Sequence, residues 1–381
     1  MIVRPRMIAA FVALVALSGC ASWFGGQSSL EKKPTPLVAF SPVDALKVSW
    51  SQSVGGTDES VFAPAVRAGW VYAGSQKGHI TEIDLQTGRA AAQIDVPNRL
   101  SGGVGAGRDN VYVVTRDAEL LSVSTDGKEN WRKKLSSLPM GAPLESAGRV
   151  FVQTQNGYVT AFDSQSGQQL WVFQRSQPAL QVHHAGSFSL VGAEVGLLGL
   201  SNGRMAVLNL ATGELLWEAT ISSPRGATEL ERVADVATPP VFDGGLVCAA
   251  AYQGRLTCLD ARSGSPLWSK DVASSRGLVM DSRQVYITSD DGVIFAFDRQ
   301  SGAQRWQQAG LRWRGVSAPV LLDQQVFVYD NKGYAHLLDR DSGAFRGQIS
   351  TGGGEALARP VGLGDRVIIQ TRSGQVMAIT K

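Results

Sequence analysis

The sequence is poor in charge, histidine and cysteine for its length. Only 18% of its 381 residues are charged, and the formal net charge is +3. A nucleic-acid-binding protein usually has a larger or more clustered excess of Lys and Arg, so we expect no nucleic-acid partner. The three cysteines are too few for a disulfide-dense scaffold.

Motifs that carry catalytic or metal chemistry are also missing from the sequence. The four histidines form no His-x-x-x-His pair and the cysteines form no Cys-x-x-Cys pair, so a zinc site is not indicated. There is no Gly-x-Ser-x-Gly elbow and no phosphate-binding loop. From the residues alone we predict no catalytic residue, no metal and no cofactor.

Long hydrophobic runs are absent except near the N-terminus, where Met7 to Leu17 is apolar and follows two arginines. This run is shorter than the roughly 20 residues that span a bilayer, and the layout is typical of a secretory signal segment. It ends in Leu-Ser-Gly-Cys, which resembles a bacterial lipobox rather than a helix closed by a buried Cys. The resemblance implies a signal peptide over 1–19, acyl chains on Cys20 and, with Ala at position 21, attachment to the periplasmic face of the outer membrane.

Residues 20–45 are the next segment, and they contain Gly, Ser and Pro with little periodicity. Such a composition favours a flexible tether between the lipid and the folded domain.

Glycine is abundant, and from residue 46 onwards it marks a repeat of about 40 residues. Each copy has an apolar strand, a turn, a second apolar strand ending near Asp, a Ser/Thr-Gly turn and, in most copies, Trp four residues later. The first turn recurs at eight positions, which are Gly78, Ala118, Gly157, Gly203, Gly254, Gly292, Gly333 and Gly374. The eighth copy stops at Lys381 without its last strand, and the segment around Trp50 supplies that strand.

The repeat predicts an all-β fold over residues 46–381, an eight-bladed β-propeller with four-stranded antiparallel blades. Strands from the N- and C-termini together complete the last blade, which argues for a closed ring rather than an open β-solenoid. The repeated Trp is expected to pack between neighbouring blades, and the repeated Asp is expected to satisfy backbone N–H groups in turns.

The motif Gly…Ala-x-Asp…Thr/Ser-Gly-x-x-x-Trp resembles the PQQ-type propeller repeat. Quinoprotein dehydrogenases carry it, and they hold pyrroloquinoline quinone and Ca²⁺ on the propeller axis. The BamB family of outer-membrane assembly lipoproteins carries it too, and this resemblance covers the whole chain: the lipobox, the tether, the eight copies and the segment 228–241. The dehydrogenases are considerably longer and commonly have a vicinal Cys pair, whereas no two Cys are adjacent here. This resemblance implies a non-enzymatic scaffold of the β-barrel assembly machinery; the alternative is a PQQ-binding enzyme.

The two longest intervals between repeats place extra residues between Trp171 and Gly203 and between Trp217 and Gly254. Excess length in adjacent blades predicts two loops on one side of the ring, and loops on rigid scaffolds tend to carry function. In the first loop, apolar side chains either contact a partner or pack under the loop. In the second, Glu229, Glu231, Arg232 and Asp235 either contact a partner or form a solvated, self-paired cluster.

The BamB resemblance implies that these loops contact the periplasmic POTRA region of BamA, within the wider BAM complex. The positions that carry over are Leu180, Val182, His183 and Asp235. His183 stands where the family usually has Arg, and Ala237 stands where it usually has a second Asp, so the polar half of this contact is weakened. Nascent outer-membrane proteins form a further candidate partner, since an extended chain could add to the outer strand of a blade.

Cys248 and Cys258 flank the Gly254 turn on consecutive predicted strands. They could form a disulfide in the oxidising periplasm if the hairpin register places them opposite each other. The sequence leaves the register open, and two buried free thiols are the slightly favoured interpretation.

Overall fold

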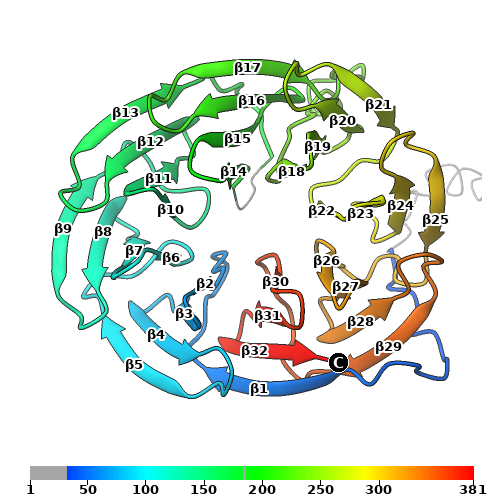
Figure 1. Cartoon of the computed structure of the whole chain (residues 1–381), viewed down its shortest axis with the longest axis horizontal. Coiled ribbons are helices and arrows are strands. Elements are labelled where there is room, and N and C mark those ends of the chain that lie inside the picture. The colour runs from blue at the N-terminus through cyan, green and yellow to red at the C-terminus, as the bar shows by residue number, and fades with distance from the viewer. Residues whose placement is uncertain (1–31, 183–185) are drawn as a thin grey trace, which may run out of the picture. The chain divides into compact units, whose positions relative to one another are not determined.

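The computed structural model describes residues 32–182 and 186–381, and within them Thr35–Lys381 form one compact unit. In the described residues, 32 strands make eight four-stranded antiparallel sheets that follow one another around a ring (Figure 1). This confirms the predicted eight-bladed propeller. No helix in this part of the chain is long and apolar enough to cross a membrane.

Each blade runs from an inner to an outer strand, and blades are numbered here in chain order. Blades 1 to 4 consist of β2 (Ala65–Arg67), β3 (Trp70–Gly74), β4 (His79–Asp84) and β5 (Ala90–Asp95); β6 (Gly105–Ala106), β7 (Asn110–Val114), β8 (Glu119–Ser124) and β9 (Glu129–Lys134); β10 (Leu144–Ser146), β11 (Arg149–Gln153), β12 (Tyr158–Asp163) and β13 (Gln169–Gln174); and β14 (Phe188–Val191), β15 (Val195–Leu200), β16 (Arg204–Asn209) and β17 (Leu215–Thr220). Blades 5 to 8 consist of β18 (Val241–Asp243), β19 (Leu246–Ala250), β20 (Leu256–Asp260) and β21 (Pro266–Lys270); β22 (Gly277–Met280), β23 (Gln284–Thr288), β24 (Ile294–Asp298) and β25 (Gln304–Gln308); β26 (Val320–Leu322), β27 (Gln325–Tyr329), β28 (Tyr334–Leu338) and β29 (Phe345–Ser350); and β30 (Val361–Gly362), β31 (Val367–Gln370), β32 (Gln375–Thr380) and β1 (Lys47–Ser53).

The last blade joins the two ends of the folded unit, as predicted. Strand β1 pairs with β32 in antiparallel register, with Trp50 opposite Ala378, and it forms the outer strand of that sheet. The Asp44 carboxylate, just before β1, lies 2.5 Å from the Arg346 guanidinium of blade 7 and 3.2 Å from the Lys381 amine. These contacts close the ring without a covalent bond.

The chain contacts blade 7 well before β1 begins. The N–H of Thr35 donates to the carbonyl of Arg312 at 3.0 Å, and the Phe40 ring stacks on Phe345 with centroids 5.5 Å apart. Residues 35–45 therefore belong to the propeller unit, although the sequence predicted a flexible tether up to residue 45. The prediction missed these contacts because they are single bonds and one ring stack, which leave no periodic pattern in the sequence.

The repeated Trp forms the same contact at six seams between blades. Its indole N–H donates to the carbonyl that follows the repeated Asp or Asn of the next blade, for example from Trp306 to Arg340 at 2.8 Å. The indole also lies on the second-turn Gly of that blade: a Cβ on Gly343, whose φ is +72°, would lie 2.5 Å from the ring. This confirms that the Trp packs between blades and explains why glycine is required beside it. The six indoles are those of Trp50, Trp131, Trp171, Trp217, Trp268 and Trp306.

The repeated Asp closes the second turn, as predicted. The Asp163 carboxylate accepts hydrogen bonds from the N–H groups of Gln165 and Ser166 and from the Ser166 hydroxyl, at 2.8 to 3.1 Å. These donors favour the ionised form and lower the pKa of Asp163. The same set of bonds recurs at Asp84, Asp260, Asp298 and Asp339.

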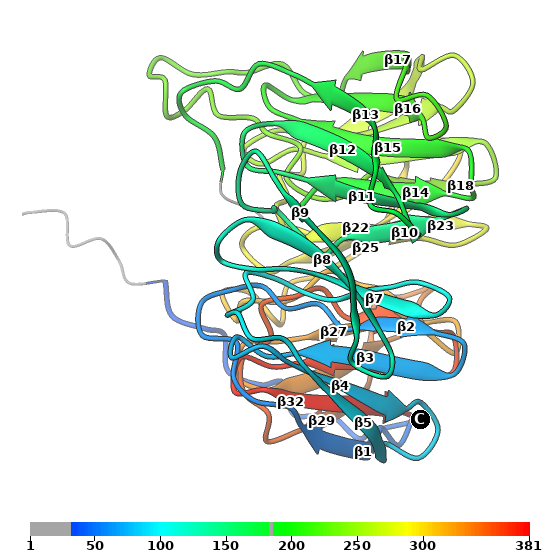
Figure 2. The same ribbon diagram turned by 90° about the vertical axis from the view of Figure 1, so that its left-hand side faces the viewer.

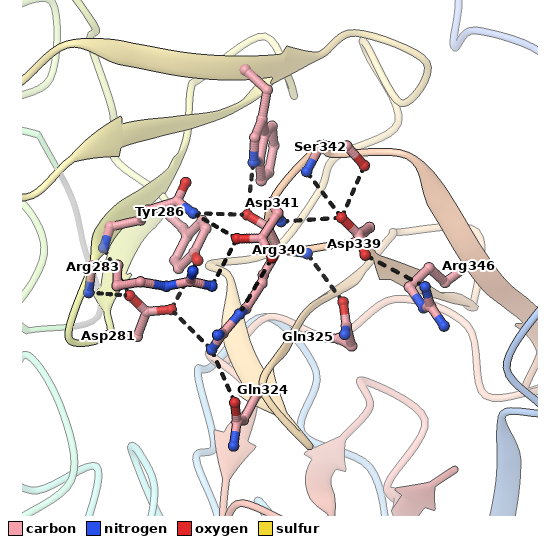
Figure 3. A network of polar contacts seen from close by, with 12 residues as sticks. Asp281, Arg283, Tyr286, Gln324, Gln325, Asp339, Arg340, Asp341, Ser342 and Arg346 are labelled. Atoms are coloured by element: carbon pink, nitrogen blue, oxygen red, sulfur yellow. Dashed lines mark hydrogen bonds and ion pairs between the residues drawn. The ribbon is translucent and has the colours of Figure 1, made fainter.

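The seam between blades 6 and 7 is further closed by a network of charged and amide side chains (Figure 3). Asp281 accepts a hydrogen bond from the Tyr286 hydroxyl at 2.9 Å and lies 3.8 Å from the guanidinium of Arg340 across the seam. Arg283 forms an ion pair with Asp341 at 2.8 Å. Desolvation and the Asp281 carboxylate raise the pKa of Tyr286, so its hydroxyl stays protonated and donates.

Cys248 and Cys258 form a disulfide, contrary to the slightly favoured interpretation of two free thiols. They lie directly opposite each other on β19 and β20, with their Cα atoms 4.1 Å apart. Such a separation is typical of a non-hydrogen-bonded pair, in which side chains approach most closely. The bond lies inside blade 5, where both residues are fully buried.

Candidate partner-binding loops

The two longest connections leave neighbouring blades on the same face of the ring. Successive strands of a blade are antiparallel, so connections from an outer strand to the next inner strand all lie on one face. Residues 175–187 join β13 to β14 and residues 221–240 join β17 to β18. Figure 2, which views the ring edge-on, shows both extending from its left-hand side. This confirms the predicted placement on one side.

Asp235 joins these two loops, and its side chain is only 3% exposed. One carboxylate oxygen accepts a hydrogen bond from the Val182 N–H at 2.7 Å, and the other accepts one from the Asn202 N–H at 3.1 Å. Burial raises the pKa of Asp235, and the two N–H donors oppose that rise. The sequence suggested a surface contact here, whereas the carboxylate is used inside the protein, because residues 233–238 fold back under the exposed part of the loop.

The apolar residues predicted in the first loop differ in exposure. Leu180 is 47% exposed, so it does not pack under the loop, while Val182 is partly buried beside Asp235. His183 lies outside the described residues. The structure thus brings Leu180, Val182 and Asp235 into one small region.

The second loop has an exposed tip that satisfies its own charges. The Glu231 carboxylate accepts hydrogen bonds from the N–H groups of Ala227 and Thr228, at 2.8 and 3.1 Å, and Arg232 donates to the Gly226 carbonyl at 3.0 Å. Glu231 and Arg232 thus bond to backbone groups of their own loop. Leu230, in the same tip, is 69% exposed. The sequence prediction missed it, although an apolar residue between two glutamates was the available signal.

The enzyme alternative requires a pocket that holds a quinone and Ca²⁺, so the openings of the described ring bear on it. Two openings of about 740 and 480 Å³ share Glu59 and Arg116 in their walls. Among the described residues, no three His, Cys, Asp or Glu side chains are grouped as metal ligands. Glu59 and Glu355 both lie within 4 Å of Arg372, so these carboxylates already have a cationic partner.

Comparison with known proteins identifies the family. A family model described as outer membrane protein assembly factor BamB matches residues 76–308, which is more than half of the chain. The chain belongs to the BamB family.

Relatives in this family match most of the chain. A BamB from Bordetella pertussis is 36% identical over 312 residues, covering 82% of this chain and 80% of that protein. BamB of Escherichia coli K12 is 29% identical over 335 residues, covering 84% of both chains. Both are named as outer membrane protein assembly factors.

Solved structures show the same fold. BamB from Moraxella catarrhalis superposes with a TM-score of 0.81 at 24% identity, covering 88% of this chain and all of that one. A quinohemoprotein alcohol dehydrogenase from Pseudomonas putida superposes with a TM-score of 0.68 at 15% identity, covering 89% of this chain and 76% of the enzyme. At these identities the likeness concerns the fold alone.

Proposed function

We propose that this protein is a non-enzymatic scaffold that assists the assembly and insertion of outer-membrane proteins. The observation that carries the proposal is membership of the BamB family, whose relatives are named as assembly factors. The fold supports it, because loops on a rigid scaffold commonly carry binding residues, and two long loops leave one face of this ring.

The partner proposed for these loops is the periplasmic POTRA region of BamA, and through it the rest of the BAM complex. Leu180 and Leu230 supply exposed apolar side chains, 47% and 69% accessible, of the kind that anchor interfaces. The Asp235 carboxylate is too buried to reach a partner directly, so its role is to hold the first loop in place through Val182. His183 of the first loop is proposed as a further contact residue.

The proposed location is the outer membrane, facing the periplasm, with acyl chains on Cys20 as the anchor. Two or more acyl chains bind a bilayer almost irreversibly. Changing Cys20 to Ser should therefore move the protein into the soluble periplasmic fraction. Protein that stayed in the membrane fraction would show that another segment anchors it.

Co-purification with BamA from solubilised membranes tests the docking face. We expect Leu180→Asp with Leu230→Asp to abolish co-purification, because each substitution places a charge in an apolar contact. The matched control is Leu363→Asp, since Leu363 is an exposed leucine on blade 8, away from both loops. Unchanged co-purification by the double variant, with an unchanged melting curve, would place the interface elsewhere.

Asp235→Ala is expected to weaken the same co-purification by a different route. Loss of the carboxylate frees the Val182 N–H, so amide exchange of residues 176–182 should rise even without BamA. In the double leucine variant this exchange should stay as in the unchanged protein. If Asp235→Ala lowered binding with no change in exchange, Asp235 would be a direct contact.

A further inference from the structure

Every blade of the described ring has a β-bulge one residue before the repeated Trp position. In blade 4, for example, Trp217 pairs with Val207 and Leu215 pairs with Leu208, which leaves Leu216 without a partner in the ladder. Bulges re-aim a side chain and are common next to functional sites. The eight bulge residues, from blade 8 through blades 1 to 7, are Ser49, Ala91, Asn130, Leu170, Leu216, Leu267, Arg305 and Arg346.

Leucine occupies this position only in three consecutive blades, 3, 4 and 5. Leu170, Leu216 and Leu267 are 45%, 51% and 57% exposed, and we refer to these three residues as the leucine rim. In blades 6 and 7 the bulge residue is Arg, and Arg305 and Arg346 form ion pairs with Asp298 and Asp339 of their own turns. The apolar rim is therefore a local property of three blades and does not follow from the repeat.

An apolar crevice of about 400 Å³ opens at the middle of the leucine rim, between blades 4 and 5. Leu216 lies at this crevice together with Trp217 and Phe242, and Phe242 is itself 40% exposed. The volume is within the range of small-ligand pockets, roughly 300–1,000 Å³. Arg262 is the one charged residue in its wall.

Blade 4 differs from blade 3 in the cross-strand row that ends at its Trp. In blade 3 the cross-strand row is Phe151, Ala161 and Trp171, and the Phe ring lies 5.7 Å from the indole. In blade 4 the same row is Leu197, Val207 and Trp217, so an aliphatic side chain stands where blade 3 has Phe151. Accordingly, Trp171 is 8% exposed, whereas Trp217 is only partly buried.

An open strand edge runs beside this crevice. Strand β17 ends its sheet, so one row of its backbone N–H and C=O groups has no neighbouring strand. An added strand would pair with that edge, and its alternate side chains would point toward the blade surface. The combination of an open edge, an apolar crevice and one arginine fits an extended apolar segment that carries an acidic residue.

We propose that the β17 edge and the crevice bind an extended peptide strand with alternating large apolar side chains, one of which enters the crevice. This deepens the proposed function and rests on it in one respect: the peptide in the cell would be a segment of an unfolded outer-membrane protein. The crevice is lined by the turns that join β14 to β15 and β20 to β21, which lie on the face opposite the two long loops. Both faces of blades 3 to 5 can therefore be occupied at once.

Fluorescence anisotropy with a labelled decapeptide tests the proposal. In the probe, Phe and Leu alternate with Thr, and one Asp replaces the Thr next to Phe. Leu216→Asp should weaken binding at least tenfold, because it places a charge where the proposed apolar side chain of the peptide is buried. Asn130→Asp, at the bulge of blade 2, is the matched control and should change binding less than twofold.

A second variant closes the crevice with side chains that blade 3 already uses. Leu197→Phe with Val207→Ala recreates the row of Phe151, Ala161 and Trp171, so it should fold and lose probe binding at least tenfold. Equal probe binding by this variant, with an unchanged melting curve, would overturn the crevice. A probe that is N-methylated at every residue should also fail to bind; if it bound equally, strand pairing would be wrong.

Two further outcomes would overturn the proposal. If sedimentation shows a dimer that Leu216→Asp converts to a monomer, the rim binds a second copy of this chain. If the probe does not bind the unchanged protein at all, the proposal is wrong. Leu180→Asp should leave probe binding intact, so loss of BamA co-purification and loss of peptide binding can be distinguished.

Discussion

The seam between blades 4 and 5 has the same Trp contact as the seam between blades 6 and 7. The two seams differ in whether other side chains fill the space beside the indole. Trp217 and Trp306 each donate to a carbonyl of the next blade, at 3.2 and 2.8 Å. Beside Trp306 the ring of Tyr286 lies 5.9 Å away and the charged network of Figure 3 closes the seam. Beside Trp217 an apolar crevice stays open. The repeated positions build the ring, and the non-repeated positions around them decide whether a seam is closed or available for binding.

The largest expected effect on stability comes from removing the repeated Trp at each of these two seams. Trp306→Ala should lower the free energy of unfolding by about 3–5 kcal/mol, the usual range for removing a buried Trp. Trp217→Ala should cost less, because its indole is partly exposed and lies at an open crevice. Chemical denaturation of both variants checks the order. Equal losses would mean that the two seams are equally well packed.

Removing the disulfide of blade 5 is expected to cause the next largest loss of stability. It closes a loop with a sequence separation of 10, so Cys248→Ala with Cys258→Ala should cost about 2–3 kcal/mol on the chain-entropy model. The unchanged protein, denatured without reductant, should show no free thiol at these two positions. Two titratable thiols there would mean that blade 5 is held by packing alone.

The charged network at the seam of blades 6 and 7 is expected to contribute less. Asp281→Ala removes the acceptor of the Tyr286 hydroxyl and an ion-pair partner of Arg340, and should cost about 1.5 kcal/mol, the low end for hydrogen bonds to charged groups. Tyr286→Phe is the matched control. If Asp281→Ala lost stability even when combined with Tyr286→Phe, the other contacts of the carboxylate would carry the effect. These are the ion pair with Arg340 and the hydrogen bonds from the N–H groups of Arg283 and Gln284.

The sequence predicted the ring because its signal is periodic: turn glycines, a Trp and an Asp recur at constant offsets. It could not predict contacts that occur once, such as the packing of Phe40 on Phe345. Whether Cys248 and Cys258 form a disulfide depended on the hairpin register, which the sequence left open. The structure places the two residues opposite each other. The repeat positions were therefore predictable, and the single contacts were not.

The candidate binding surfaces could also be predicted only in part from the sequence. Leu216 precedes Trp217 in a strand, and simple alternation would place the two on opposite faces. Only the bulge shows that Leu216 leaves the ladder and lies at the crevice beside the Trp. Asp235 sits in a charged loop and suggested an exposed contact, but the backbone bonds that bury it come from residues far along the chain.

The smallest expected effect is a difference in pH dependence between two carboxyl groups of opposite pKa shift. For Asp339, at the seam of blades 6 and 7, desolvation is outweighed by hydrogen bonds from Ser342 and by Arg346, so its pKa is lowered. Its contribution to stability is therefore present above the unfolded value of about 3.9 and is lost as the pH falls below it. For Asp235, desolvation raises the pKa, so lowering the pH from 7 toward about 4 should relieve an unfavourable charge.

Melting temperatures at pH 7, 5, 4 and 3 compare the unchanged protein with Asp235→Asn and Asp339→Asn. Relative to Asp235→Asn, the unchanged protein should gain stability between pH 7 and 4, since protonation makes its side chain neutral like that of Asn. Relative to Asp339→Asn, its advantage should hold down to about pH 4 and shrink below it. If both differences moved in the same direction with pH, the buried carboxylate that joins the two loops would behave as an ordinary paired carboxylate, and its assignment as a desolvated positioning group would be wrong.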